Sequence, residues 1–404
     1  MAGEAGVQVP QALRTALDAW AAGAENPAEK GNGPAASRDR FGTGGRGLPG
    51  LLWNKGAKRR EGELSTKYGI EIGPGPAGGT HFSHSEINKI DKVLGTLPRR
   101  DLADNKSLRG LVRGGGQGGL VSLFDPDTSR VHIQHPVGLP AWLYTRLQRG
   151  SGWQRRLMDL GAAAGYDGLS IGQRCSVLGR SRDRRQVMGK VLSHGSLLSW
   201  TLRHEIGHSV DQQHQWLLTD SAKPEFGGWQ AHLGSYGCRA VARAFLAPYG
   251  ITEEGAIHWL AHRIAPDSEG VVRVNAALAS DLTRDLPEAG RTLGQSGLRQ
   301  LVRDLGLATE QPWMLPKGGT DRLTRDGRVY QVDQYGSWCS YLASARHHGV
   351  SPYQFSSADE FFAESYAAFH DPVAGTTLRR RLHPDAATWF KDRTQQPRPE
   401  EASC

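Results

Sequence analysis

The pentapeptide HEIGH at residues 204–208 constrains the fold more than any other part of the sequence. On a helix, His204 and His208 lie one turn apart on one face, which is the separation needed to bind a single metal ion. The nearby apolar residues fall on the opposite face: Leu202, Ile206 and Val210. The pattern therefore predicts a helix that packs in the core along one side and presents two metal ligands along the other.

The helix that carries HEIGH is expected to run from Leu197 to about Leu218, with Ser196 as its N-cap. Glu205 lies beside the histidines and is predicted to act as a base on a metal-bound water. Asp211 shares the histidine face, where its carboxylate can accept the remaining N–H of a ligand imidazole. This helix thus supplies two ligands, a base and a residue that can orient a ligand.

A catalytic zinc site needs a third protein ligand and leaves its fourth position to water, and the sequence offers three candidates. His214 stands at the metzincin spacing in HEIGHSVDQQH, but Asp211 occupies the position where that pattern needs a turning glycine. Glu225 lies in a Pro-Gly loop, KPEFGG, that does not fix its direction. Glu360 precedes Glu364 by one helical turn in DEFFAES, so both carboxylates share a face.

The stretch 357–370 (SADEFFAESYAAFH) is expected to be a helix. Its apolar stripe lies opposite the two glutamates: Phe362, Tyr366 and Phe369. Ser357 and Glu360 can form a capping box, which would make Glu360 part of a solvated helix start. Ser356 with Asp359 can form the same cap one residue earlier, which leaves Glu360 as a ligand and Glu364 as the acceptor for a ligand histidine.

The combination of HEIGH with DEFFAESYAAFH resembles the lethal-factor type of metallopeptidase domain, which is related to secreted Pro-Pro endopeptidases. The resemblance implies zinc as the cofactor, Glu360 as the third ligand, and a catalytic role for Tyr353, seven residues earlier. HFSHSEINKIDKVLGTLP and HPDAATWF resemble the opening and closing helices of such domains. The interval between His208 and Glu360 is longer than in that family.

The expected fold is α+β: a mainly helical, zincin-like peptidase with a small sheet. Short strands are predicted at 119–134 around the turn DPDTS and at 328–334 behind Asp326-Gly327. The predicted division of the chain is a flexible N-terminal segment at 1–62, a first peptidase part at 63–220, a helical insertion at 221–320, a second peptidase part at 321–392 and a tail at 393–404.

Composition excludes several classes of function. No stretch approaches about 18 consecutive apolar residues, so no membrane-spanning helix is expected. The net charge of +8 is scattered among acidic neighbours, with one compact basic run at 55–60, and does not favour nucleic-acid binding. The four cysteines form no C-x-x-C pair, which excludes a zinc ribbon: Cys175, Cys238, Cys339 and Cys404.

The sequence therefore predicts a zinc endopeptidase that hydrolyses a protein or peptide. The alternatives are a metzincin-like peptidase that uses His214, and a non-catalytic component of a larger assembly that zinc stabilises. The resemblance implies a toxin or effector. Because the first residues show no secretory signal, we expect synthesis in the cytoplasm and export by a non-Sec route, with 1–62 binding a delivery apparatus.

Overall fold

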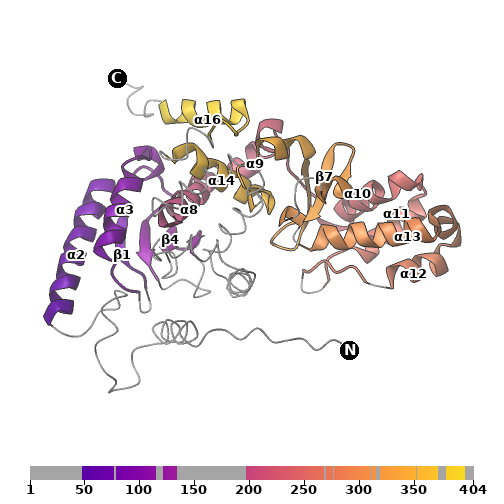
Figure 1. Ribbon diagram of the computed structural model, residues 1–404, viewed down its shortest axis with the longest axis horizontal. Helices are drawn as coiled ribbons and strands as arrows, with labels where there is room; N and C mark the ends of the chain where they lie inside the picture. The colour runs from indigo at the N-terminus through magenta and orange to yellow at the C-terminus, as the bar shows by residue number, and fades with distance from the viewer. Residues whose placement is uncertain are drawn as a thin grey trace, which may run out of the picture.

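The structure is a computed structural model that describes residues 48–76, 79–114, 122–133, 197–267, 270–275, 277–310, 312–314, 319–351, 353–371 and 379–395. The described helices are α2 (Leu48–Tyr68), α3 (His84–Leu94), α8 (Leu197–His214), α9 (Trp216–Thr219), α10 (Gly234–Leu246), α11 (Glu254–Arg263), α12 (Leu278–Asp285), α13 (Pro287–Thr309), α14 (Ala358–His370) and α16 (Pro384–Gln395). Together with two small sheets they form the mixed α+β fold that the sequence predicted (Figure 1).

The first sheet contains β1 (Glu71–Pro74), β2 (Gly110–Arg113), β4 (Arg130–Ile133) and β3 (Leu123–Asp125), in that spatial order. The first three strands are parallel, and β3 pairs with β4 in the antiparallel sense across the DPDTS turn, which confirms the predicted hairpin. Helix α3 packs between α2 and α8, with three apolar residues fully buried: Ile87, Ile90 and Val93. This arrangement places β3 at the edge of the described sheet, beside α8.

The predicted boundary at residue 62 is wrong, because α2 runs without interruption from Leu48 to Tyr68. Glu61 is 3% exposed: one carboxylate oxygen accepts the Phe82 N–H at 2.7 Å, and the other lies 2.6 Å from His81 Nδ1. Composition predicted a linker here because glycine and charge are frequent, but a helix needs only one narrow buried stripe. Residues 1–47, the rest of the predicted flexible segment, lie outside the described residues.

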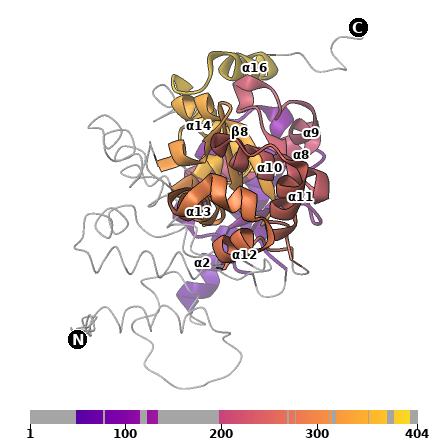
Figure 2. The same ribbon diagram turned by 90° about the vertical axis from the view of Figure 1, so that its right-hand side faces the viewer.

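Helices α8 and α14 lie against each other at the centre of the molecule (Figures 1 and 2). Gly207, the glycine of HEIGH, allows this close approach, since a Cβ on it would lie 3.0 Å from the Ala363 Cα and 3.2 Å from the Tyr366 Cβ. The sides of α14 that face away from α8 are covered as well, and residues 360–370 are all buried. Phe362 packs against Trp216 of α9 and Phe390 of α16. The site helices are therefore held by a dense aromatic core.

The second sheet contains β5 (Gln230–Ala231), β8 (Trp338–Leu342), β7 (Arg328–Val332) and β6 (Thr324–Arg325), all antiparallel. Asp326 and Gly327 both have positive φ, which gives the tight β6–β7 turn expected from the sequence. The expected helices of 221–320 are present as α10 to α13, at the opposite end of Figure 1 from α2. They pack on β8: Trp338 Nε1 donates to the Ile264 carbonyl at 2.8 Å, and Phe245 contacts the Trp338 ring.

Among the described residues, no helix is both long and apolar enough to cross a membrane.

Substitution of Glu61 tests whether α2 belongs to the folded domain. Glu61→Ala leaves the buried Phe82 N–H without its acceptor, so we expect a loss of about 1–3 kcal/mol in the free energy of unfolding. The control is Glu63→Ala, whose carboxylate is half exposed and pairs only with Arg59 and Arg60; it should cost less than about 0.5 kcal/mol. Guanidinium denaturation measures the free energy of unfolding of both variants. Equal losses in Glu61→Ala and Glu63→Ala would contradict the packed position of α2.

Candidate metal centre

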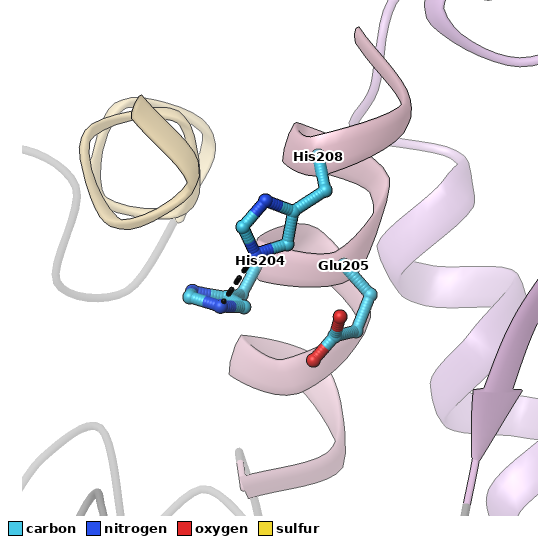
Figure 3. Close-up of side chains that lie close together, drawn as sticks. All are labelled: His204, Glu205 and His208. Atoms are coloured by element: carbon cyan, nitrogen blue, oxygen red, sulfur yellow. Dashed lines mark hydrogen bonds between the residues drawn. The ribbon is translucent and has the colours of Figure 1, made fainter. Parts of the chain in front are cut away.

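His204 and His208 project from one face of α8 toward α14, and Glu205 projects from the neighbouring face (Figure 3). The two Nε2 atoms lie 3.2 Å apart. The predicted apolar stripe is confirmed, since each of its residues is at most 1% exposed: Leu202, Ile206 and Val210. The buried group His204, Glu205 and His208 brings its ligand atoms close enough together to hold a metal ion.

Glu360 comes from the first turn of α14 and completes a set of three donors. Its Oε2 atom lies 3.0 Å from His204 Nε2 and 3.8 Å from His208 Nε2. Ligands at about 2.0–2.1 Å from a tetrahedral metal are separated from one another by roughly 3.3 Å. The three observed separations scatter around that value, so the three atoms fit one ion with a small adjustment of side chains.

The predicted cap at Ser356 and Asp359 is wrong in detail. The N-cap of α14 is Ser357, which makes no side-chain cap hydrogen bond, and the Ser356 hydroxyl donates to the Tyr353 carbonyl instead. The capping box that would have occupied Glu360 is also absent from the hydrogen bonds at this described helix start. Glu360 is therefore directed to the histidines and is 5% exposed.

Glu364 orients His204, as the sequence predicted. Its Oε1 atom lies 2.9 Å from His204 Nδ1, and the carboxylate also accepts from Trp200 Nε1 at 3.1 Å and from the Ser351 hydroxyl at 2.5 Å. Because an ionised carboxylate only accepts, Nδ1 carries a hydrogen, and in the neutral imidazole the lone pair is then on Nε2. Glu364 thus fixes the tautomer in which His204 can bind a metal.

Positive charge on His204 or on a bound metal ion would balance the buried carboxylate of Glu360. Burial lowers the pKa of His204, but the charge of Glu360 and the hydrogen bonds to Glu360 and Glu364 raise it well above its usual range. Burial lowers the pKa of His208, which favours the neutral, metal-binding form of this imidazole. Glu360 Oε2 is buried and, apart from His204 Nε2 at 3.0 Å, has no hydrogen-bond donor among the described residues. A metal ion bound between this oxygen and the two imidazoles would supply such a charge.

The two other candidates for the third ligand lie elsewhere. His214 is exposed at the end of α8, where its Nε2 atom contacts Arg393 of α16. The α8 helix ends at His214 and not near Leu218, because Gln215 adopts a left-handed conformation (φ 50°) before α9 begins. Glu225 belongs to a short 3-10 turn and to neither group of described residues that could hold a metal. The geometry therefore favours Glu360.

The predicted role of Asp211 as an acceptor for a ligand histidine is wrong. Its Oδ1 atom accepts the Leu217 N–H at 2.9 Å, and none of the hydrogen bonds of the described residues joins it to His204 or His208. The reason is the helix break at Gln215, which turns the backbone of α9 back toward Asp211. Burial raises the pKa of Asp211 to about 6. Asp211 stabilises the junction of α8 and α9.

Glu205 is 5% exposed and is aligned by the edge strand β3, since its Oε2 atom accepts the Phe124 N–H at 2.8 Å. Tyr353 lies on the other side of the site. Its hydroxyl is 2.7 Å from Glu360 Oε1 and 3.1 Å from Gln334 Oε1. The structure thus brings together Glu205, the three donors and Tyr353 at one place.

Sequence reasoning missed Gln334, which lies in the turn between β7 and β8. Its Nε2 atom donates to Glu360 Oε1 at 2.9 Å. No local pattern marks it, because a single glutamine in a hairpin turn has no periodic signature. Cys339, in β8, is buried, and burial raises the pKa of its thiol well above the usual range, which disfavours a reactive thiolate.

Metal analysis of two variants tests the choice of the third ligand. Purified protein is expected to bind one divalent ion, and Glu360→Ala should abolish tight binding because it removes one of three donors. His214→Ala is the matched control and should keep full occupancy, since His214 contacts Arg393 instead. Elemental analysis after gel filtration gives the stoichiometry. Loss of metal in His214→Ala with retention in Glu360→Ala would reverse the assignment.

No protein-family model, curated protein or solved structure matches this chain. The case for a metal centre therefore rests on its own residues: three converging donor atoms, of which the Glu360 carboxylate is buried.

Proposed function

We propose that this protein is a zinc-dependent endopeptidase with a zincin-like fold. The observation that carries the proposal is the convergence of His204, His208 and Glu360 beside the carboxylate of Glu205. Two imidazoles and one carboxylate form the ligand set of many catalytic zinc sites, in which the fourth position is left for water. A purely structural zinc site normally has four protein ligands, so the set of three found among the described residues favours a catalytic role.

Zinc held by these residues would supply Lewis-acid chemistry, acidifying a water and polarising a carbonyl group. The protein's own part begins with Glu205, which takes a proton from the attacking water and passes it to the leaving amine. The Phe124 N–H holds Oε2 of Glu205 at 2.8 Å, which orients the carboxylate for this transfer. Tyr353 donates a hydrogen bond to the oxygen on which negative charge develops.

The position of β3 supports a peptide substrate. This strand lies at the edge of the first sheet and next to α8. Its Phe124 N–H points away from β4 and toward Glu205. An edge strand can pair with an extended peptide through backbone hydrogen bonds, which would place the peptide across the metal site. The proposal that the peptide belongs to a protein attacked by a toxin or effector rests on the family resemblance.

Substitution of Glu205 separates catalysis from metal binding. Glu205→Gln keeps the shape and an oxygen that can accept the Phe124 N–H, but it cannot take up a proton. We expect full zinc content and a fall in turnover of about 10²- to 10⁴-fold, measured on a library of fluorogenic peptides. A wild-type protein that binds zinc and cleaves none of the peptides or denatured proteins tested would favour the structural alternative.

Removal of one hydroxyl tests Tyr353. A donor that meets full negative charge only in the transition state affects turnover more than substrate binding. Tyr353→Phe keeps the ring, so zinc content and thermal stability should stay close to those of the wild type, while kcat falls on the order of 100-fold and KM changes little. Wild-type kcat in this variant would assign Tyr353 to packing alone.

A further inference from the structure

Gln334 connects the third ligand to the tyrosine hydroxyl. Its side-chain amide donates from Nε2 to Glu360 Oε1 at 2.9 Å, and its Oε1 atom lies 3.1 Å from the Tyr353 hydroxyl. The same Glu360 oxygen accepts from that hydroxyl at 2.7 Å. The three side chains therefore meet at the edge of the metal centre, where the one hydrogen of the Tyr353 hydroxyl is given to either Glu360 or Gln334.

We propose that Gln334 is a positioning residue of this centre: it holds Glu360 with a single oxygen toward the metal and keeps that geometry when the Tyr353 hydroxyl moves to the substrate. The inference rests on the proposed metal site, and it assigns a function to a hairpin turn outside the two site helices.

The hydrogen-bond capacity of the three groups gives the reason. Two donors on Glu360 Oε1 leave Oε2 as the atom that faces His204 and His208, so the carboxylate binds through one oxygen and the fourth metal position stays open. The Tyr353 hydroxyl has one hydrogen, which it can give to only one acceptor at a time. When it is given to the reacting oxygen, Gln334 is the donor that remains on Glu360.

The turn that carries Gln334 is fixed independently of its side chain. Asp333 Oδ1 accepts the N–H groups of Tyr335 and Ser337, both at 2.9 Å, and the Asp333 N–H donates to the Ser337 carbonyl at 2.8 Å. Gly336 adopts the left-handed φ of 88° that closes the turn. The backbone N–H of Gln334 donates to the Ser356 carbonyl, just before α14. The side chain is thus presented by a rigid loop.

The test is the zinc dissociation constant of Gln334→Met, measured by competition with a chromophoric chelator. Methionine keeps the length of the side chain and removes both its donor and its acceptor, so the dissociation constant should rise about 10- to 100-fold, as for other residues that orient metal ligands. Gln212→Met is the matched control, because Gln212 is exposed on α8 and the chemical change is the same. Its dissociation constant should stay within about twofold of the wild-type value.

A double variant gives a readout that a merely structural role would not move. Because Gln334 and Tyr353 hold the same oxygen, each can partly replace the other, so the rise in dissociation constant for Gln334→Met/Tyr353→Phe should exceed the product of the single effects. A wild-type dissociation constant in Gln334→Met, or a product of independent effects in the double variant, would overturn the inference.

A thermal melt controls for an effect of the substitution on folding. The backbone hydrogen bonds of the turn do not use the Gln334 side chain, so metal-free Gln334→Met and Gln334→Ala should have melting temperatures within a few degrees of that of the metal-free wild type. If both variants fail to fold, Gln334 belongs to the folding core and the inference is overturned. The titration needs no peptidase activity, so a protein that binds zinc and cleaves nothing would contradict the proposed function while the dissociation constants still decide the role of Gln334.

Discussion

The contact between α8 and α14 is the feature on which the candidate site depends. Gly207 lets the two helices approach so closely that Glu360 and Glu364 of one helix reach both nitrogens of His204 on the other. A larger residue at 207 would press on the backbone of Ala363 and separate the carboxylates from the imidazoles. The close packing of α8 and α14 at the candidate site thus requires the glycine in HEIGH. The aromatic residues that cover α14 contribute packing energy that offsets the entropy lost when segments far apart in the sequence are brought together.

The buried charges of the site favour a metal ion bound between the two histidines and Glu360. Glu205, Glu360 and Glu364 are each at most 5% exposed. Burying carboxylates is costly unless charge and hydrogen bonds offset the loss of water. Glu205 and Glu364 accept hydrogen bonds from N–H or O–H groups, whereas the described residues offer Glu360 Oε2 only His204 Nε2, at 3.0 Å. A divalent cation bound between Glu360 and the two imidazoles would neutralise this carboxylate.

Local sequence patterns predicted much of the site and less of the fold around it. The faces of α8 and α14 follow from helical periodicity, so His204, His208, Glu360 and Glu364 were predicted where the structure has them. Asp211 was predicted wrongly because the left-handed conformation of Gln215 leaves no mark in the sequence. The burial of Glu61 was not predicted, because the composition of this part of the chain is typical of linkers. Gln334 reaches the site only through the tertiary fold, which no local pattern encodes.

The long interval between His208 and Glu360 does not disturb the ligand geometry, and the second sheet shows why. The chain leaves this sheet after β5 and returns to it at β6, and β5, β8, β7 and β6 lie side by side. A segment that begins and ends in one sheet can be long at little entropic cost to the rest of the fold. The helices of this segment also stabilise the second sheet. The Ile264 carbonyl accepts a hydrogen bond from Trp338, and Phe245 packs against the Trp338 ring, at the start of β8 and directly after the turn that carries Gln334. The packing of α10 to α13 on this hairpin therefore supports the position of the third ligand.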